Sequence, residues 1–436
     1  MIKKVSVIGA GLAGCEASYQ LAKRDIEVDL YDIKPNSFTP AHSNKNFAEI
    51  VCSNSLKSVD ISTASGLLKK ELELLDCLIL KCAYACQVPA GNALAVDREK
   101  FSELVTQKIK SFKNINFISK NVDELPEGVV IVATGPLTTN ELSKKLSSIF
   151  ESDNLHFYDA SSPIIDANTI NMNKAFYASR YDKGEASYIN CPMNKEEYEF
   201  FYNELISAEK VELKSFEKKE IFEGCMPIEI MASRGIDSLR YGPLKPVGLN
   251  HPQTNEKYYA VVQLRKEDNT QSLYNMVGFQ TNLTFGAQKR VFSLIPGLEN
   301  ANFVKYGVMH RNSYINAPQI LFNTFQTKTN PNLFIAGQLS GVEGYIESTA
   351  SGLIAGLNAY LLLNNLPLLK LSSNTMIGAI SNYISTCSLK NFQPMNANFG
   401  IISPLGEKIK DEKLRKQKMV ERALEEVSKS IEEFKI

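Results

Sequence analysis

The stretch that decides the fold is VSVIGAGLAG, residues 5–14. Its β-branched run leads into three glycines spaced G-x-G-x-x-G, and a helical pattern continues from there through Leu21. A second strand-like run, residues 27–31, ends at Asp32, 18 residues beyond the third glycine. This order of strand, glycine turn, helix, strand and acid is typical of a dinucleotide-binding βαβ unit.

Each residue of this unit has a separate physical role. Gly9 allows the tight turn, Gly11 lets the backbone approach a pyrophosphate, and Gly14 lets the helix lie close to the sheet. The N–H groups at the start of the helix face the phosphates. The carboxylate of Asp32 can accept hydrogen bonds from ribose hydroxyls. We therefore predict a dinucleotide site here, in preference to a glycine-rich turn without a ligand.

Two later segments indicate which dinucleotide binds. Residues 128–136 and 332–338 each form an apolar run that ends in small residues, and a further helix begins near Ser348. A second helix N-terminus some three hundred residues away suits a long, two-ended cofactor, so we predict FAD rather than NAD. The candidate cofactor-binding residues are Gly9, Ala10, Gly11, Leu12, Ala13, Gly14, Asp32, Thr134, Gly135, Gly337, Gln338, Gly344 and Tyr345.

Composition limits the class of protein. The 436 residues contain 44% hydrophobic residues, which is enough for a sizeable core and argues against a disordered or fibrous chain. Lys plus Arg equals Asp plus Glu at 48 each, so a nucleic-acid partner would need a local basic patch. The sequence shows no signal-peptide core, and asparagines interrupt the apolar residues 352–369. We expect a cytoplasmic protein with free thiols and no membrane span.

The pattern of strands and helices changes between residues 190 and 305, where turns and short strands replace regular alternation. We interpret this stretch as a smaller α+β substrate domain inserted into a discontinuous FAD-binding domain, residues 1–189 and 306–436. Residues 407–436 have the apolar spacing of an amphipathic helix, with many lysines near its start. This helix either docks on its own domain or presents a phosphate-binding patch.

The eight cysteines differ in their surroundings. Cys52 lies in a polar loop with several hydroxyls and amides, and Cys225 lies between Gly224 and Met226-Pro227, a backbone that exposes a side chain. Both are candidate catalytic thiols, because reactive cysteines need exposure and a polar or cationic neighbour. The histidines and the remaining cysteines lack the spacing of a metal site, so we predict none.

Long blocks of the chain resemble the folate- and FAD-dependent RNA (uracil-5-)-methyltransferase family, usually called TrmFO. The resemblance runs from residue 1 to about residue 356. Two positions depart from the family's pattern: Asp32 stands where the family carries Glu, and Asn92 where relatives carry Gly. The blocks are residues 40–58, 88–98, 224–230, 234–249, 274–281, 306–312 and 337–345.

This resemblance implies a glutathione-reductase-like α/β fold, with an FAD-binding Rossmann domain and an inserted smaller domain. It implies transfer of the methylene of 5,10-methylenetetrahydrofolate to C5 of a uridine in RNA, followed by reduction to methyl by FADH2 that NAD(P)H regenerates. In the family both matching cysteines are functional, and they fall on Cys52 and Cys225. The residues do not indicate which is the nucleophile and which the acid or base. Candidates for the folate cleft are Arg98, Arg240, His310 and Arg311.

Three alternatives stay open at this point. The same chemistry could act on a uridine of 23S ribosomal RNA instead of the tRNA T-loop. A GidA-like sister family that modifies wobble uridines shares the glycine turn, but it carries a long C-terminal extension and lacks the block around Cys52. A flavoprotein that binds RNA without turnover is the third. The sequence indicates neither the preferred pyridine nucleotide nor the oligomeric state.

Overall fold

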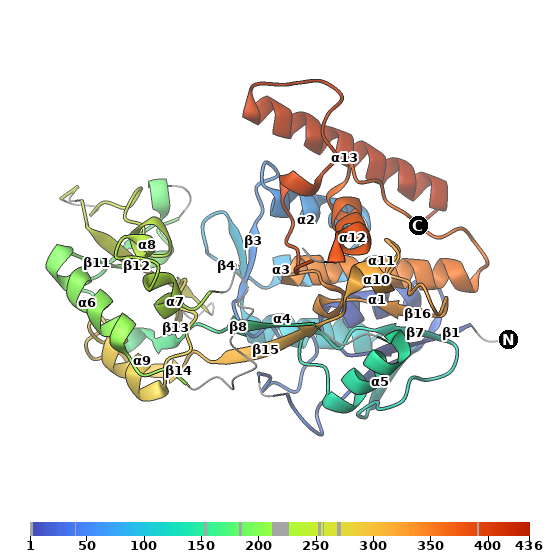
Figure 1. Ribbon diagram of the computed structural model, residues 1–436, viewed down its shortest axis with the longest axis horizontal. Helices are drawn as coiled ribbons and strands as arrows, with labels where there is room; N and C mark the ends of the chain where they lie inside the picture. Colours follow the sequence, from blue (N-terminus) through green and yellow to red (C-terminus); the bar gives the residue numbers. More distant parts are fainter. Residues whose placement is uncertain are drawn as a thin grey trace.

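The computed structural model forms two domains joined by a narrow two-stranded ribbon (Figure 1). The ribbon pairs β8 (Leu155–Ala160) with β15 (Met309–Tyr314) in antiparallel register. Each domain has its own hydrophobic core. The structure describes residues 3–39, 41–151, 155–182, 185–211, 226–251, 254–255, 257–267, 272–389 and 392–436.

The larger domain is built on a five-stranded parallel sheet in the order β16-β7-β1-β2-β6. Its strands other than the edge strand β6 are mostly buried, as in parallel sheets covered by helices on both faces. The βαβ unit predicted from residues 5–14 is confirmed. The strands are β1 (Lys4–Ile8), β2 (Glu27–Asp32), β6 (Ile115–Ser119), β7 (Val129–Val132) and β16 (Leu333–Ile335).

Helix α1 (Leu12–Ala22) packs directly on α11 (Tyr345–Leu363), and small residues permit the contact. A Cβ atom on Gly352 would lie 2.1 Å from the backbone oxygen of Ala13, and one on Gly356 would lie 2.9 Å from the Cα of Ala17. Helix α11 has the length and apolarity of a membrane span, but 78% of its most apolar window is buried inside the protein. It is therefore the central helix of the core.

Further helices surround this core, and the C-terminal one lies across the edge of the domain (Figure 1). The amphipathic helix predicted at the C-terminus is α13 (Glu412–Phe434), which packs on α2 through Val420, Ala423 and Val427. A small antiparallel sheet, β3-β5-β4, faces the other domain. The remaining elements are β3 (Ser55–Ser58), α2 (Ala64–Leu74), α3 (Leu78–Ala85), β4 (Gln87–Val88), β5 (Ala93–Val96), α4 (Arg98–Lys110), α5 (Asn140–Phe150), α10 (Ala317–Ile320) and α12 (Met376–Thr386).

The smaller domain is a six-stranded antiparallel sheet in the order β10-β11-β12-β13-β9-β14. Residue 190, where the sequence suggested that this domain starts, falls inside β11. The sheet already includes β9 and β10, whose short apolar runs look like strands of the larger domain. Its elements are β9 (Ile164–Asp166), β10 (Phe176–Ala178), β11 (Tyr188–Met193), α6 (Lys195–Ser207), α7 (Ile228–Ala232), α8 (Ser238–Tyr241), β12 (Ala260–Lys266), β13 (Leu273–Met276), α9 (Phe285–Phe292) and β14 (Phe303–Lys305).

We predict that Gly352→Ala destabilises the protein by about 1–3 kcal/mol, because the added methyl group forces α11 away from α1. Gly286→Ala in α9 is the matched control: Gly286 is exposed, and a Cβ there would meet no atom within 4 Å. It should be neutral or slightly stabilising. Urea unfolding followed by circular dichroism compares the two, and equal free energies of unfolding would contradict this account of the helix contact.

Candidate functional site

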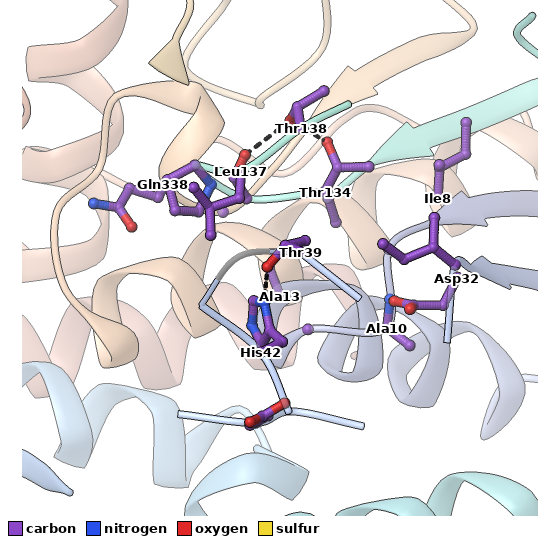
Figure 2. Close-up of a pocket in the computed structure, with 18 of the residues that line it drawn as sticks. Ile8, Ala10, Ala13, Asp32, Thr39, His42, Thr134, Leu137, Thr138 and Gln338 are labelled. Carbon is purple, nitrogen blue, oxygen red and sulfur yellow. Dashed lines mark hydrogen bonds between the residues drawn. The ribbon is translucent and has the colours of Figure 1, made fainter. Parts of the chain in front are cut away.

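A large pocket opens at the carboxyl edge of the parallel sheet, where ligands bind in open α/β folds (Figure 2). It encloses about 1350 Å³ of space, including the part open to solvent. The glycine turn, the loops after β2 and β7, and the start of α11 line it. Of the predicted cofactor residues, Gly9, Ala10, Gly11, Leu12, Ala13, Asp32, Thr134, Gly135, Gly337, Gln338 and Tyr345 line this pocket.

The other two predicted glycines shape the surrounding backbone instead. A Cβ on Gly14 would lie 1.8 Å from the backbone oxygen of Gly9, so the glycine lets α1 begin directly against the turn. Gly9 itself has φ +103°, and a Cβ there would lie 2.5 Å from the oxygen of Ala133. Gly344 precedes α11 with φ +116°. Only glycine can therefore occupy positions 9 and 14 of the turn. The absence of side chains there allows the backbone to approach a pyrophosphate closely.

The carboxylate of Asp32 lies at the end of β2, beside Ala10 (Figure 2). One of its oxygens accepts the N–H of Ala10 at 2.7 Å and the other accepts the N–H of Lys34 at 2.9 Å. These bonds fix the carboxylate and connect it to the glycine turn. Each carboxylate oxygen has a second lone pair, so the group can still accept a ribose hydroxyl.

Further polar side chains complete the pocket, and of these only Thr134 is among the residues predicted from the sequence. Thr134 and Thr138 join their hydroxyls at 2.6 Å on one side, and Thr39 bonds His42 Nδ1 at 2.5 Å on the other (Figure 2). Lys34 forms a 2.9 Å ion pair with Glu49. These residues follow the carboxyl ends of β2 and β7 in the sequence. Because ligands bind at that edge of a parallel sheet, their position after the two strands could have identified them as pocket residues.

Cys52 lies in the same pocket, and its Sγ is 2.9 Å from the hydroxyl oxygen of Tyr345. That oxygen also accepts the backbone N–H groups of Val51 and Cys52, at 3.0 and 2.9 Å. A phenolic oxygen offers one donor and two acceptor sites. Because the two N–H groups fill the acceptor sites, the Tyr345 hydroxyl is left to donate to the sulfur.

The protonation of Tyr345 supports this direction of the hydrogen bond. Burial raises the pKa of its hydroxyl well above the ordinary value, with a further contribution from the neighbouring Cys52. The hydroxyl therefore keeps its proton. Cys52 is partly exposed and interacts electrostatically with Arg98, Arg265 and Lys305. A partly exposed sulfur with a hydrogen-bond donor and nearby cations has the surroundings of a reactive cysteine.

The structure places the other predicted residues elsewhere or leaves them undescribed. Cys225 lies outside the described residues, as do the side chains of His310 and Arg311. Arg240 lies in the smaller domain, with its guanidinium 3.6 Å from the ring centre of Tyr259. Arg98 contacts the backbone of the Cys52 loop and a carboxylate of the smaller domain. Neither Arg240 nor Arg98 lines this pocket.

Comparison with known proteins gives full-length relatives. The family model described as glucose inhibited division protein A matches residues 4–367. A methylenetetrahydrofolate--tRNA-(uracil-5-)-methyltransferase TrmFO of Acetivibrio thermocellus is 55% identical over 435 residues, which cover 100% of both chains. A protein of the same name from an Exiguobacterium species is 53% identical over 433 residues. The matched residues cover 99% of each chain.

Solved structures show the same fold at low sequence identity. GidA of Aquifex aeolicus superposes with a TM-score of 0.68 in one crystal form, at 16% identity, over 99% of this chain and 75% of the GidA chain. A second crystal form gives a TM-score of 0.67. The similarity confirms the predicted α/β fold.

We predict that Asp32→Asn weakens FAD binding by about 10- to 150-fold, because a hydrogen bond to a charged group contributes about 1.5–3 kcal/mol. Asp29→Asn is the matched control: Asp29 lies on the same strand, but it pairs with Lys4 and does not line the pocket. Fluorescence titration of the apoprotein with FAD measures both dissociation constants. Equal affinity in the two variants would show that Asp32 does not contact the cofactor.

Proposed function

The chain belongs to the glucose inhibited division protein A family and to the methylenetetrahydrofolate--tRNA-(uracil-5-)-methyltransferases TrmFO, and from this membership we propose that it methylates C5 of a uridine in tRNA. The methylene group comes from 5,10-methylenetetrahydrofolate, FAD is the bound cofactor, and NAD(P)H is the reductant. One observation carries the proposal: over its full length, this chain shares more than half of its residues with proteins of that name.

The same observation decides among the alternatives. The curated relatives are named for tRNA, which favours tRNA over ribosomal RNA as the substrate. The likeness to solved GidA is one of fold, and this chain covers only 75% of the GidA chain, whereas it covers the TrmFO relatives completely. A wobble-uridine enzyme is therefore not favoured. As a tRNA-modifying enzyme, the protein is expected in the cytoplasm.

The residues that line the pocket fit FAD in their chemistry. The glycine turn and the N-terminus of α1 can hold the pyrophosphate, and Asp32 can hold a ribose. When bound, reduced FAD and the folate supply the hydride and the one-carbon unit of the new methyl group.

Cys52 and Cys225 supply the remaining chemistry in this proposal. Uracil C5 is a poor nucleophile until a thiolate adds to C6, and a general base must later accept the proton from C5. The two cysteines divide these roles. The hydrogen bond between the Tyr345 hydroxyl and Sγ of Cys52, two residues that line the pocket, supports this role for Cys52. We infer that the uridine and the one-carbon donor meet beside this thiol.

The proposed function is tested by incubating purified protein with FAD, NADPH, labelled methylenetetrahydrofolate and unmodified tRNA or ribosomal RNA. We expect label in 5-methyluridine of tRNA, identified by mass spectrometry of nucleosides. Cys52→Ala and Cys225→Ala should each lower the rate by at least about 100-fold. Cys387→Ala is the control, because Cys387 is also partly exposed but lies outside the pocket. Label in ribosomal RNA alone would refute tRNA as the substrate. Full activity in Cys52→Ala or in Cys225→Ala would refute the role of that cysteine.

We predict that Tyr345→Phe lowers kcat by about 10- to 150-fold, since a hydrogen bond to a charged group contributes about 1.5–3 kcal/mol. The substitution keeps the ring but removes the donor to Cys52 and the acceptor of two backbone N–H groups. Tyr383→Phe is the control, because the Tyr383 hydroxyl donates to Gln393 outside the pocket. Unchanged kcat in Tyr345→Phe, with FAD content equal to the parent, would remove Tyr345 from the mechanism.

A further inference from the structure

We propose that the smaller domain positions the catalytic loop of the larger one: Glu267, acting through Arg98, and Arg265 hold the loop on both sides of Cys52. These three are positioning residues, which we call the interdomain clamp. The clamp deepens the proposed function, on which its kinetic test rests, and it names residues that neither bind the cofactor nor react.

The first half of the clamp holds the residues just before Cys52. Arg98 begins α4 in the larger domain and donates from Nη1 to the carbonyl oxygens of Ile50 and Val51, at 3.2 and 2.8 Å. Its Nε and Nη2 donate to the two carboxylate oxygens of Glu267, at 2.6 and 3.2 Å. These four hydrogen bonds use four of the five N–H donors of a guanidinium. The Arg98 guanidinium therefore connects the loop to the smaller domain by hydrogen bonds.

The ion pair between the domains is shielded from water. The Glu267 side chain is 4% exposed and that of Arg98 is 17% exposed. Burial lowers the pKa of Arg98, but the Glu267 carboxylate outweighs this effect and leaves the pKa raised. Removing one partner of such a pair leaves a charge uncompensated, which is far more costly than losing a surface ion pair.

The second half of the clamp holds the residues just after Cys52. Arg265, near the end of β12, donates from Nη2 to the hydroxyl of Ser53 at 2.7 Å and from Nε to the side-chain oxygen of Asn54 at 2.9 Å. The amide nitrogen of Asn54 donates in turn to the carbonyl oxygen of Lys266 at 2.8 Å. Arg265 and Asn54 are both buried.

Together with Tyr345, the clamp fixes the loop from three directions. Arg98 forms hydrogen bonds with the carbonyl groups that precede Cys52, and Arg265 forms them with the side chains that follow it. Tyr345 forms them with the N–H and the sulfur of Cys52 itself. A free loop of this length would allow the sulfur to move by more than the 1 Å that separates productive from unproductive geometry. The orientation of the thiol therefore depends on the smaller domain being seated against the larger one.

The test uses the full-length holoenzyme with three variants. Arg98→Lys keeps the charge but cannot bridge two carbonyl groups and a carboxylate at once. Glu267→Gln keeps the size and removes the charge. Arg290→Lys is the matched control, because Arg290 also bridges two carboxylates, Glu204 and Glu209, but on the exposed surface of the smaller domain. Hydrogen–deuterium exchange of the peptide covering residues 50–54 reports on the loop without requiring activity.

We expect exchange in residues 50–54 to speed up on the order of tenfold in Arg98→Lys and Glu267→Gln, and not in Arg290→Lys. In the methyl-transfer assay, kcat should fall by roughly 100-fold in Arg98→Lys while KM for tRNA stays unchanged. Unchanged exchange in both clamp variants, or a rise in KM without loss of kcat, would overturn the clamp. Should Arg98→Lys fail to fold, Glu267→Gln decides alone. A parent enzyme without methyl transfer would refute the proposed function and leave the exchange result standing.

Discussion

The whole site depends on backbone contact between segments that are far apart in the chain. Gly14 lets α1 begin directly on the turn at Gly9, and Gly352 lets α11 lie directly on Ala13. These contacts leave no room for a side chain, so the two helices reach the same edge of the parallel sheet with their N-termini. The pocket, the carboxylate of Asp32 and the hydroxyl of Tyr345 all take their places from this arrangement.

A second constraint acts on the thiol rather than on the cofactor. Cys52 sits on a loop without regular structure, and such loops are usually the most mobile part of a domain. Here hydrogen bonds from α11, from α4 and from the smaller domain converge on five consecutive residues. The pocket and the held loop have different tasks in the proposed function: the pocket binds the flavin, and the loop orients the sulfur of Cys52.

Local sequence patterns made the pocket predictable, but they did not reveal the contacts that hold the Cys52 loop. The glycine spacing and the acid at residue 32 indicate the βαβ unit because they serve contacts within one short stretch. The pairing of Arg98 with Glu267 joins residues 169 positions apart, and no periodicity marks either of them. The early start of the smaller domain was missed because Ile164 and Ile165 read like any buried strand.

The order of strands has a consequence for synthesis on the ribosome. β7 ends at Val132, but its neighbour β16 begins only at Leu333, after the entire smaller domain has been made. Until then β7 is an unpaired edge, and the surface of α1 that α11 later covers is exposed. The smaller domain, with a core of its own, can complete its folding during this interval. The nascent chain can therefore complete this pocket only after the smaller domain, once the start of α11 has been made.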